Sequence, residues 1–436
     1  MERNLLIEIL EDWNFWNREL ETGKERTNYL SKCCAFLKSN AVLAIMGVRR
    51  SGKSYILRQF AKHLIKNGVA KEEILIMNFE DHRFAEFYPK LLCEIYELYI
   101  ELLQPKGKPY ILLDEVHNIP EWERWIRTIH ELQKAKIIVS GSTAKLLSGE
   151  LATVLTGRHL DLYIFPASFK EFLTFHGLET TEALDVVSKR IEIKRLFREY
   201  IEYGGFPEVI LSLEKKRLLL TYIDDLVTKD VEKRHRIRKP EKLRALVRFY
   251  MTNIARPVTF RSIGAWLELS TDTVEKFSGY IEDAQLLFFV KAFSFKIKDQ
   301  EKTPRKIYPI DVGLSNAIGF RFSENIGRLE EALVAIELRR KQLNEPTIEI
   351  FYWKDYNKEV DFVVKEGIEV KELIQVCHDI SDREKKKYEI RALIKASREL
   401  KCRKLLVITA DYEAEEKIKK KKINFIPLWK WLLAKI

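Results

Sequence analysis

The chain has 436 residues, of which 46% are hydrophobic and 32% charged, and it carries a formal net charge of +11. This length exceeds one ordinary hydrophobic core and the composition excludes a disordered or fibrous protein, so we expect two or three folded domains. The positive charge favours contact with a polyanion, nucleic acid above all, although a basic proteome or cancelling surface charges would give the same total.

The cysteines and the apolar runs indicate the cellular compartment of the protein. Five cysteines, an odd number without CxxC spacing, indicate neither a disulfide framework nor a zinc site. The N-terminal stretch MERNLLIEILEDWNFW lacks a basic segment before an apolar core, and no apolar run approaches the ~18 residues of a membrane span. We therefore expect a soluble, cytoplasmic protein with no membrane partner.

Helices are predicted over residues 1–38, and an α/β fold after them. Short apolar runs then alternate with amphipathic stretches, a pattern that predicts a mainly parallel sheet with helices on both faces. The predicted strands are 41–46, 73–79, 110–114, 136–141 and 160–165, and the clearest helices are 53–68 and 121–135.

The rest of the chain is predicted to be helical first and mixed afterwards. Residues 168–250 have helical patterns, interrupted by GGFP, and residues 258–290 contain two short helices followed by apolar strands. That order is typical of a winged helix-turn-helix. The last part has a predicted helix at 330–342, strands at 347–353, 359–364 and 368–377, and then a helix, the strand 404–409 and a closing helix.

The segment MGVRRSGKS follows the first predicted strand and fits the phosphate-binding pattern GxxxxGK[ST]. In such a loop the backbone N–H groups and the start of the next helix surround phosphate. Lys53 is expected to reach the β- and γ-phosphates, and the Ser54 hydroxyl to ligate Mg²⁺. The predicted nucleotide-binding residues are Gly47, Val48, Arg49, Arg50, Ser51, Gly52, Lys53, Ser54 and Tyr55.

Two carboxylates end the predicted strand YILLD and favour hydrolysis over simple binding. Asp114 is expected to hold Mg²⁺ through its water shell, and Glu115 to polarise the water that attacks the γ-phosphate. The alternative is an acidic strand end that caps the next helix. The phosphate-binding loop upstream makes the catalytic interpretation the stronger one.

Two further residues are candidates for catalysis. Ser142, in VSGST at the end of the next strand, can hydrogen-bond the γ-phosphate or the attacking water, unless the small residues only form a tight turn. Arg158 precedes the fifth strand and is a candidate arginine finger, in cis or across a subunit interface. Arg49 and Arg50 are candidates for contact with phosphate or with a neighbouring protomer. Surface salt bridges are the alternative for all three arginines.

These stretches, together with EYGGFPEV, RKIYPIDVGL and GRLEEALVAIELRR, resemble an archaeal and bacterial family of AAA+/STAND-type P-loop ATPases. Its members carry an AAA_14-like domain followed by a C-terminal DUF4143-type region, and the resemblance covers roughly residues 35–410. It implies an additional-strand P-loop NTPase sheet of order 5-1-4-3-2, with ATP as nucleotide and Mg²⁺ as cofactor. It also implies that Gly205 and Pro207 form a GxP element near the adenine, whereas the residues alone predict a helix break.

The resemblance and the patterns together predict five segments. They are an N-terminal helical segment at 1–38, an AAA+-like core at 39–200, a helical lid or connector at 201–244, a winged helix at 245–322 and a nuclease-like domain at 323–436.

Two surfaces of the C-terminal half are candidates for nucleic acid. The expected recognition helix, STDTVEKFSGYIEDAQ, has as many acidic as basic residues, which slightly favours packing or a protein partner over DNA. The residues around this helix are Arg261, Thr271, Asp272, Thr273 and Lys276. Residues 229–249 are more basic, and they either follow a phosphate backbone or form a solvated helical surface.

The last segment resembles the PD-(D/E)xK nuclease fold, in which carboxylates and a lysine hold Mg²⁺ and activate water. Glu331 and Asp361 match two of its acids, but Gln375 and Cys377 stand where Glu and Lys are expected. These losses weaken metal binding and the support of the attacking water, which predicts a degenerate site. The nearby Glu369-Val370-Lys371 has the ExK letters, but about 20 Å early along the strand.

We therefore expect a Mg-dependent ATPase that acts as a switch or motor, with C-terminal domains that engage nucleic acid or a protein partner. One alternative is an ATP-regulated nuclease that uses the last domain. The other is an ATP-binding assembly or regulatory module with negligible turnover. The sequence allows an oligomer but does not fix its size.

Overall fold

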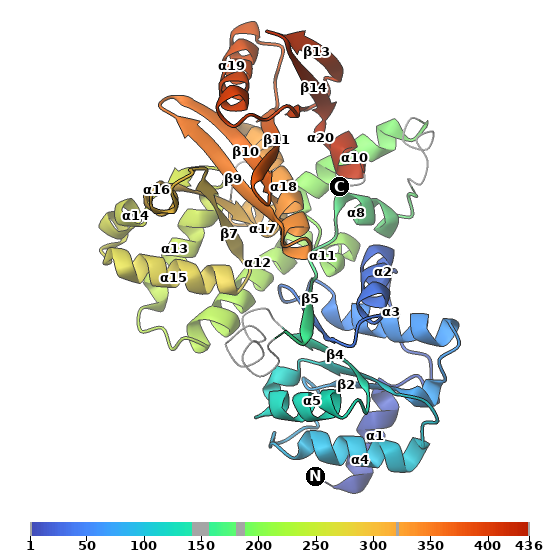
Figure 1. Ribbon diagram of the computed structural model, residues 1–436. Helices are drawn as coiled ribbons and strands as arrows, with labels where there is room; N and C mark the ends of the chain where they lie inside the picture. Colours follow the sequence, from blue (N-terminus) through green and yellow to red (C-terminus); the bar gives the residue numbers. More distant parts are fainter. Residues whose placement is uncertain (1, 142–156, 180–187, 320–321, 435–436) are drawn as a thin grey trace. The chain divides into compact units, whose positions relative to one another are not determined.

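The chain forms two compact units, Met1–Ile164 and Phe165–Ile436, in the computed structural model shown in Figure 1. The structure describes residues 2–141, 157–179, 188–319 and 322–434. The division between the units falls inside the segment 39–200 that the sequence assigns to one core.

The first unit is built on a five-stranded parallel sheet. Its order is β2-β3-β4-β1-β5, so the expected order 5-1-4-3-2 is confirmed. The first four strands are mainly apolar, as expected for a parallel sheet that is covered on both faces, whereas the edge strand β5 alternates apolar and polar residues. The strands are β1 (Val42–Met46), β2 (Ile74–Asn78), β3 (Tyr110–Asp114), β4 (Lys136–Gly141) and β5 (His159–Tyr163).

Helices cover both faces of this sheet, because successive strand residues point to opposite sides. On one face, α1 (Arg3–Trp13), α4 (Leu91–Leu103) and α5 (Trp122–Glu131) pack on residues such as Ala44 and Leu113. On the other face, α2 (Thr27–Phe36) and α3 (Lys53–Lys66) pack on residues such as Leu43 and Ile45 (Figure 1). The described part of the unit also contains two short 3₁₀ turns, η1 (Lys71–Glu73) and η2 (Val116–Asn118).

The side chain of Asn14 covers the edge strand β2. Its Nδ2 donates to the carbonyls of Leu10, at 2.7 Å, and Ile76, at 2.9 Å, and its Oδ1 accepts from the Ile76 N–H at 2.6 Å. Asn14 is fully buried. The side chain therefore satisfies backbone groups that an edge strand otherwise leaves unpaired.

Asn14→Ala is expected to lower the unfolding free energy of the first unit by about 2–4 kcal/mol, because buried backbone groups lose their partners. Urea unfolding of wild type and variant measures this loss. Asn67→Ala is the control, since Asn67 is exposed and its side chain donates to His63 O of its own helix. Equal effects of the two substitutions would contradict the role of Asn14.

The second unit begins with helices. They are α8 (Phe169–Phe175), α10 (Arg190–Tyr203), α11 (Pro207–Leu211), α12 (Lys215–Asp225), the π-helical η3 (Leu226–Lys233) and α13 (Pro240–Thr252). Pro240 stands at the first position of α13, where its missing N–H costs no hydrogen bond. Pro240 therefore marks the start of a helix inside the basic segment 229–249.

A nine-stranded sheet of order β13-β14-β12-β11-β10-β9-β7-β8-β6 runs through the rest of the unit. Helix α18 packs on β8, β9 and β11, and α19 packs on β10 and β11. The strands are β6 (Pro257–Val258), β7 (Leu287–Ala292), β8 (Arg305–Pro309), β9 (Ile348–Asp355), β10 (Lys358–Glu366), β11 (Glu369–Cys377), β12 (Leu405–Thr409), β13 (Ala414–Ile418) and β14 (Lys421–Pro427). The helices are α14 (Phe260–Leu267), α15 (Thr271–Asp283), α16 (Ile297–Lys302), α17 (Val312–Ala317), α18 (Phe322–Asn344), α19 (Arg383–Glu399) and α20 (Leu428–Leu433).

The hairpin of β13 and β14 corrects the sequence prediction, which placed only a helix after the strand 404–409. Lys419 and Lys420 join the two strands and both have positive φ, 49° and 66°. A two-residue turn of this kind normally uses Asn or Gly, so the lysine run gave no turn signal. The closing helix is the shorter α20.

None of the helices in the described part of the chain combines the length and the apolar character needed to cross a bilayer.

Candidate functional site

The phosphate-binding loop connects β1 to α3 in the first unit, as the sequence predicts. A Cβ on Gly47 would lie 2.2 Å from the carbonyl oxygen of Ile164, so no other residue fits there. Gly52, with φ of 97°, caps the start of α3, and Arg50 also has positive φ, 67°. The loop is therefore a tightly folded cradle at the carboxyl end of β1.

Buried polar groups point into this cradle. The ammonium of Lys53 donates to the carbonyls of Gly47, at 3.2 Å, and Val48, at 3.3 Å. The hydroxyl of Ser51 is buried and has no hydrogen-bond partner in the part of the chain that the structure describes. Arg26, a buried residue that the sequence analysis missed, donates from Nη1 to Ser51 O at 3.0 Å and fixes the loop from behind.

The two predicted magnesium ligands, Ser54 and Asp114, are joined by a hydrogen bond. Asp114 is buried at the end of β3, next to β4, and accepts hydrogen bonds from the hydroxyls of Ser54 and Ser140. Burial raises the pKa of the Asp114 carboxyl, while these hydrogen bonds and the charge of Lys53 oppose the rise. Ser140 was not predicted, although it lies in the same VSGST stretch as Ser142.

Glu115 turns toward the same cradle from the residue after β3. Its backbone is left-handed, with φ of 54°, a conformation that costs energy for a residue with a side chain and that clusters at functional sites. Its Oε1 lies 3.9 Å from Lys53 Nζ, and its Oε2 lies 3.4 Å from Nε2 of His117. Burial raises the pKa of Glu115 to about 7, against the attraction of Lys53 and with repulsion from Asp114. His117 is a second residue that the sequence analysis missed.

These residues fit a nucleotide and a divalent cation. The glycine cradle, the unpartnered Ser51 hydroxyl and the Lys53 ammonium provide donors and space for phosphate oxygens. Ser54 and Asp114 provide the oxygen ligands that Mg²⁺ prefers. The donor set is therefore that of a phosphate and magnesium site.

The candidate arginines Arg49 and Arg158 each pair with a glutamate. Arg49 extends from the loop to Glu80, with 3.1 Å between Nη1 and Oε1. Arg158 lies at the amino end of β5, beside the start of β1, and its guanidinium pairs with Glu131. Because the phosphate-binding loop follows the opposite end of β1, this placement argues against action in cis. Action across a subunit interface stays a prediction, and Ser142 lies outside the described residues.

The predicted GxP element has a structural explanation inside the second unit. The N–H of Gly205 donates to Oδ2 of Asp311 at 2.7 Å, and a Cβ on Gly205 would lie 2.2 Å from Ala167 O. Pro207 is the first residue of α11. Burial raises the pKa of Asp311 to about 6. The close approach requires glycine without any nucleotide, and contact of Gly205 and Pro207 with adenine stays a prediction.

The second unit brings the predicted nuclease-like acids together around a lysine. The ammonium of Lys306, from β8, lies 2.8 Å from Glu331, 3.0 Å from Asp361 and 2.7 Å from Glu359. Tyr308 donates to Glu331 Oε1 at 2.6 Å. Burial opposes the charge of Lys306, but the surrounding carboxylates raise its pKa well above the usual value.

The other nuclease-like positions make structural contacts. Gln375 accepts from the N–H of Asp361, at 3.3 Å, and donates to Glu389, at 2.8 Å. The thiol of Cys377 contacts the carbonyl of Asp379 at 3.2 Å. The strand register pairs Phe362 with Ile374, which leaves the ExK letters at the far end of β11.

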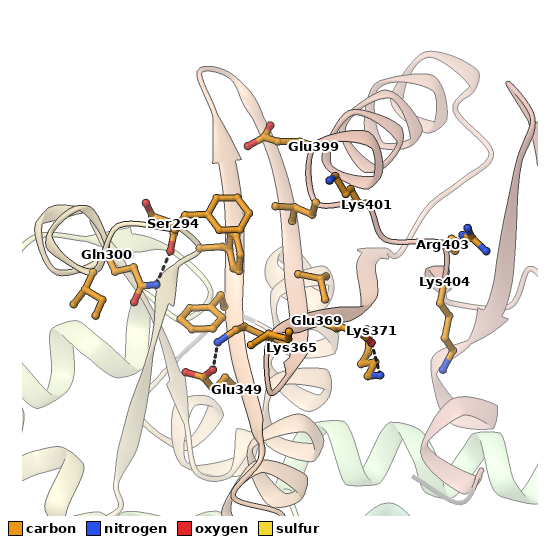
Figure 2. A pocket seen from close by; sticks show the side chains of 17 residues that line it. Ser294, Gln300, Glu349, Lys365, Glu369, Lys371, Glu399, Lys401, Arg403 and Lys404 are labelled. Atoms are coloured by element: carbon orange, nitrogen blue, oxygen red, sulfur yellow. Dashed lines mark hydrogen bonds and ion pairs between the residues drawn. The ribbon is translucent and has the colours of Figure 1, made fainter.

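That far end lines an open groove of about 1220 Å³ in the second unit (Figure 2). Phe295 and Ile368 are exposed on it, and charged side chains surround them. Most of these charges are paired. Lys371 pairs with Glu369 at 2.7 Å and Lys365 pairs with Glu349, as Figure 2 shows. Lys404 pairs with Glu372, which lies outside the groove. The ExK letters therefore form a surface ion pair and do not join Glu331 and Asp361.

Comparison with known proteins supports a P-loop fold for the first unit. Residues 39–173 match the family described as an AAA domain, and residues 194–325 match a domain of unknown function, DUF8612. The second match overlaps the region where a DUF4143-type domain is expected, and the DUF4143-type assignment stays a prediction.

Two relatives extend over most of the chain. An uncharacterised protein of Methanocaldococcus jannaschii is 35% identical over 409 residues, which are 91% of this chain and 89% of that protein. An uncharacterised protein of Haemophilus influenzae is 31% identical over 370 residues, which are 82% of this chain and 87% of that one. A solved structure, the Walker-type ATPase of Pyrococcus abyssi, is similar with a TM-score of 0.45 and 13% identity, over 68% of this chain and 95% of that one.

The AAA-domain match agrees with the parallel sheet of order β2-β3-β4-β1-β5 and with the phosphate-binding loop. The two relatives align with 91% and 82% of this chain. The chain belongs to one family with these archaeal and bacterial relatives, and its residues 39–173 carry an AAA domain with a P-loop.

Proposed function

We propose that the protein is a Mg-dependent ATPase whose hydrolysis drives a switch or motor, and that its second unit engages nucleic acid or a protein partner. One observation supports hydrolysis above all. The buried carboxylate of Glu115 lies beside the Lys53 ammonium, while Asp114 is bonded to Ser54 in the same cradle. A module that only binds nucleotide has no need of that second buried carboxylate.

Each residue has a task in this proposal. Lys53 and the loop N–H groups bind the phosphates, and Ser54 with Asp114 would hold the cation. Bound Mg²⁺ would neutralise charge on the β- and γ-phosphates. Glu115 accepts a proton from the attacking water. The pKa of Glu115 is about 7, because burial raises it and the Lys53 ammonium opposes that rise.

We expect kcat/KM for ATP to rise with pH through an apparent pKa near 7. Below that pH the Glu115 carboxyl is protonated in the nucleotide-free protein and cannot accept a proton, whereas above it the carboxylate is available. Phosphate release measured from pH 5.5 to 9 in excess Mg²⁺ gives this profile, and EDTA should abolish the release.

The control for this profile is Lys53→Ala, which should release no phosphate above background at any pH. Tight ATP binding without turnover at any pH would contradict the proposal and support the alternative of a regulatory binding module. Release that continues in Lys53→Ala would point to a contaminating enzyme and remove the support.

For the second unit we propose the two folds that the sequence predicts. The elements α13, β6, α14, α15, β7 and β8 follow the order of a winged helix, with β8 antiparallel to both β6 and β7. The elements α18, β9, β10, β11, α19 and β12 follow the order of a PD-(D/E)xK domain.

We further propose that this last domain does not cleave nucleic acid. The Lys306 ammonium lies among the carboxylates that a nuclease would use for its metal ion, and Gln375 is engaged with Glu389. A lysine that cancels the acidic charge removes the attraction for a divalent cation. The nuclease alternative would regain support if purified protein cut DNA in Mn²⁺ and Asp361→Ala lost that activity.

A further inference from the structure

The basic segment and the expected recognition helix, which the sequence treats as separate candidates, meet in one pocket of about 390 Å³. Arg236, Arg238 and Lys239 come from the connection between η3 and α13, and Lys276 comes from α15. We propose that these four residues, called the basic pocket from here on, bind the phosphate backbone of double-stranded DNA.

The charges of the basic pocket are uncompensated. All four side chains are exposed, and none has an ion pair among the residues that the structure describes. The acid on the rim, Glu268, lies 3.7 Å from Lys242. Four cations without acidic partners in one concave surface match the charge of a polyanion, whereas paired surface charges contribute little.

Helix α15 adds uncharged donors to the same surface. Its first N–H groups open beside Ser270, whose side chain accepts from the N–H of Thr273 at 3.2 Å. Thr273, Lys276 and Tyr280 line the pocket from one face of the helix, spaced by three and four residues. The helix start and the hydroxyls therefore complement the cations, as in contacts that fix a protein on a DNA backbone.

The aromatic rings of the basic pocket favour a duplex over a single strand. The ring of His235 stacks on Tyr280, with centroids 3.5 Å apart and planes at 9°. Proteins that bind single strands stack bases on aromatic faces, and here that face is covered. Duplex DNA presents a major groove wide enough for a helix such as α15, whereas the major groove of duplex RNA is too narrow for side-chain readout.

This inference rests on the proposed engagement of nucleic acid by the second unit and is independent of ATP hydrolysis. Binding is therefore measured without nucleotide, and hydrolysis without DNA, so that failure of one leaves the other intact.

The test is fluorescence anisotropy of a labelled 25-base-pair duplex, titrated with the full chain at several salt concentrations. Arg236→Gln/Arg238→Gln is expected to weaken binding at least tenfold at 0.1 M salt. The slope of log K against log salt is expected to fall by about 1.8, since each lost phosphate contact contributes roughly 0.9. Wild type should bind the duplex more tightly than a single strand of equal length.

The matched control is Lys401→Gln/Arg403→Gln on the groove of Figure 2, which removes the same charge. Each pair contains one residue with positive φ, Arg236 in the pocket and Lys401 in the control, so backbone effects are also matched. The control should bind within twofold of wild type. Equal loss in both variants, tighter binding to the single strand, equal binding of a polyglutamate peptide or no binding by wild type would each overturn the proposal.

Discussion

Glu115→Gln is expected to bind ATP as wild type does and to hydrolyse it about 10²–10⁴-fold more slowly, the usual contribution of a general base. Gln keeps the size of the side chain and removes the group that can take a proton. The Lys53 ammonium, which lies 3.9 Å from Glu115, still contacts the carbonyls of the loop. Binding through the loop therefore survives while the chemical step is lost.

Two measurements separate these effects. Titration with a fluorescent ATP analogue gives the dissociation constant, and single-turnover phosphate release gives the chemical step without product release. Glu101→Gln is the control, because this exposed acid at the surface of α4 pairs with Arg3 and with no other cation in the described ranges. It should leave both quantities unchanged.

The neighbouring His117 makes this experiment decisive. Its Nε2 lies 3.4 Å from Glu115, so it is another group near the cradle that could accept a proton. Hydrolysis by Glu115→Gln within threefold of wild type would show that Glu115 is not the base. A variant that no longer binds ATP would show that Glu115 supports the loop and would leave the role in proton transfer without evidence.

Local signals explain why the sequence predicted the first unit so well. The strands 110–114 and 136–141 were placed at their observed bounds, because short apolar runs between amphipathic helices allow few other folds. Lys53, Ser54 and Asp114 come together as expected, since parallel strands bring their carboxyl ends to one edge of a sheet. The pattern carries that geometry without any knowledge of side-chain contacts.

Contacts between residues that are distant in the sequence cannot be predicted from such local patterns. Arg26 supports the loop from 25 positions upstream, with no motif around it. The sequence predicts Arg158 as an arginine finger because it precedes a strand, yet that position lies at the amino edge of the sheet. Lys306 stands in RKIYPID as an ordinary strand lysine, and its charge meets Glu331 and Asp361 only after the two halves of the second unit pack.

Lys306→Met is expected to destabilise the second unit by about 3–5 kcal/mol, because it leaves buried carboxylates without their cation. The Lys306 side chain is 1% exposed, and its ammonium lies within 3.0 Å of Glu331, Glu359 and Asp361. It joins β8 to α18 and β10. For a unit of this size the loss corresponds to a fall in Tm on the order of 6–12 °C.

The defect should depend on pH in a definite direction. Burial and the charge of Asp361 already raise the pKa of Glu331 in wild type, against the attraction of Lys306, and loss of the ammonium removes that attraction. A carboxyl whose pKa is higher in the folded state binds more protons when folded, so the stability it contributes at low pH is lost as pH rises through its folded pKa. The variant should therefore approach wild type near pH 5 and fall furthest behind at pH 8.

Calorimetric unfolding at both pH values measures this difference, with two further variants as references. Lys404→Met removes an exposed lysine that lies 3.0 Å from Glu372, and should change stability by no more than about 1 kcal/mol. Lys306→Met/Glu331→Gln removes one of the stranded charges and should recover part of the loss at pH 8. If Lys306→Met unfolded as wild type does at pH 8, the Lys306 ammonium would not be needed to neutralise these carboxylates. The argument that Lys306 takes the place of a metal ion among them would then be contradicted.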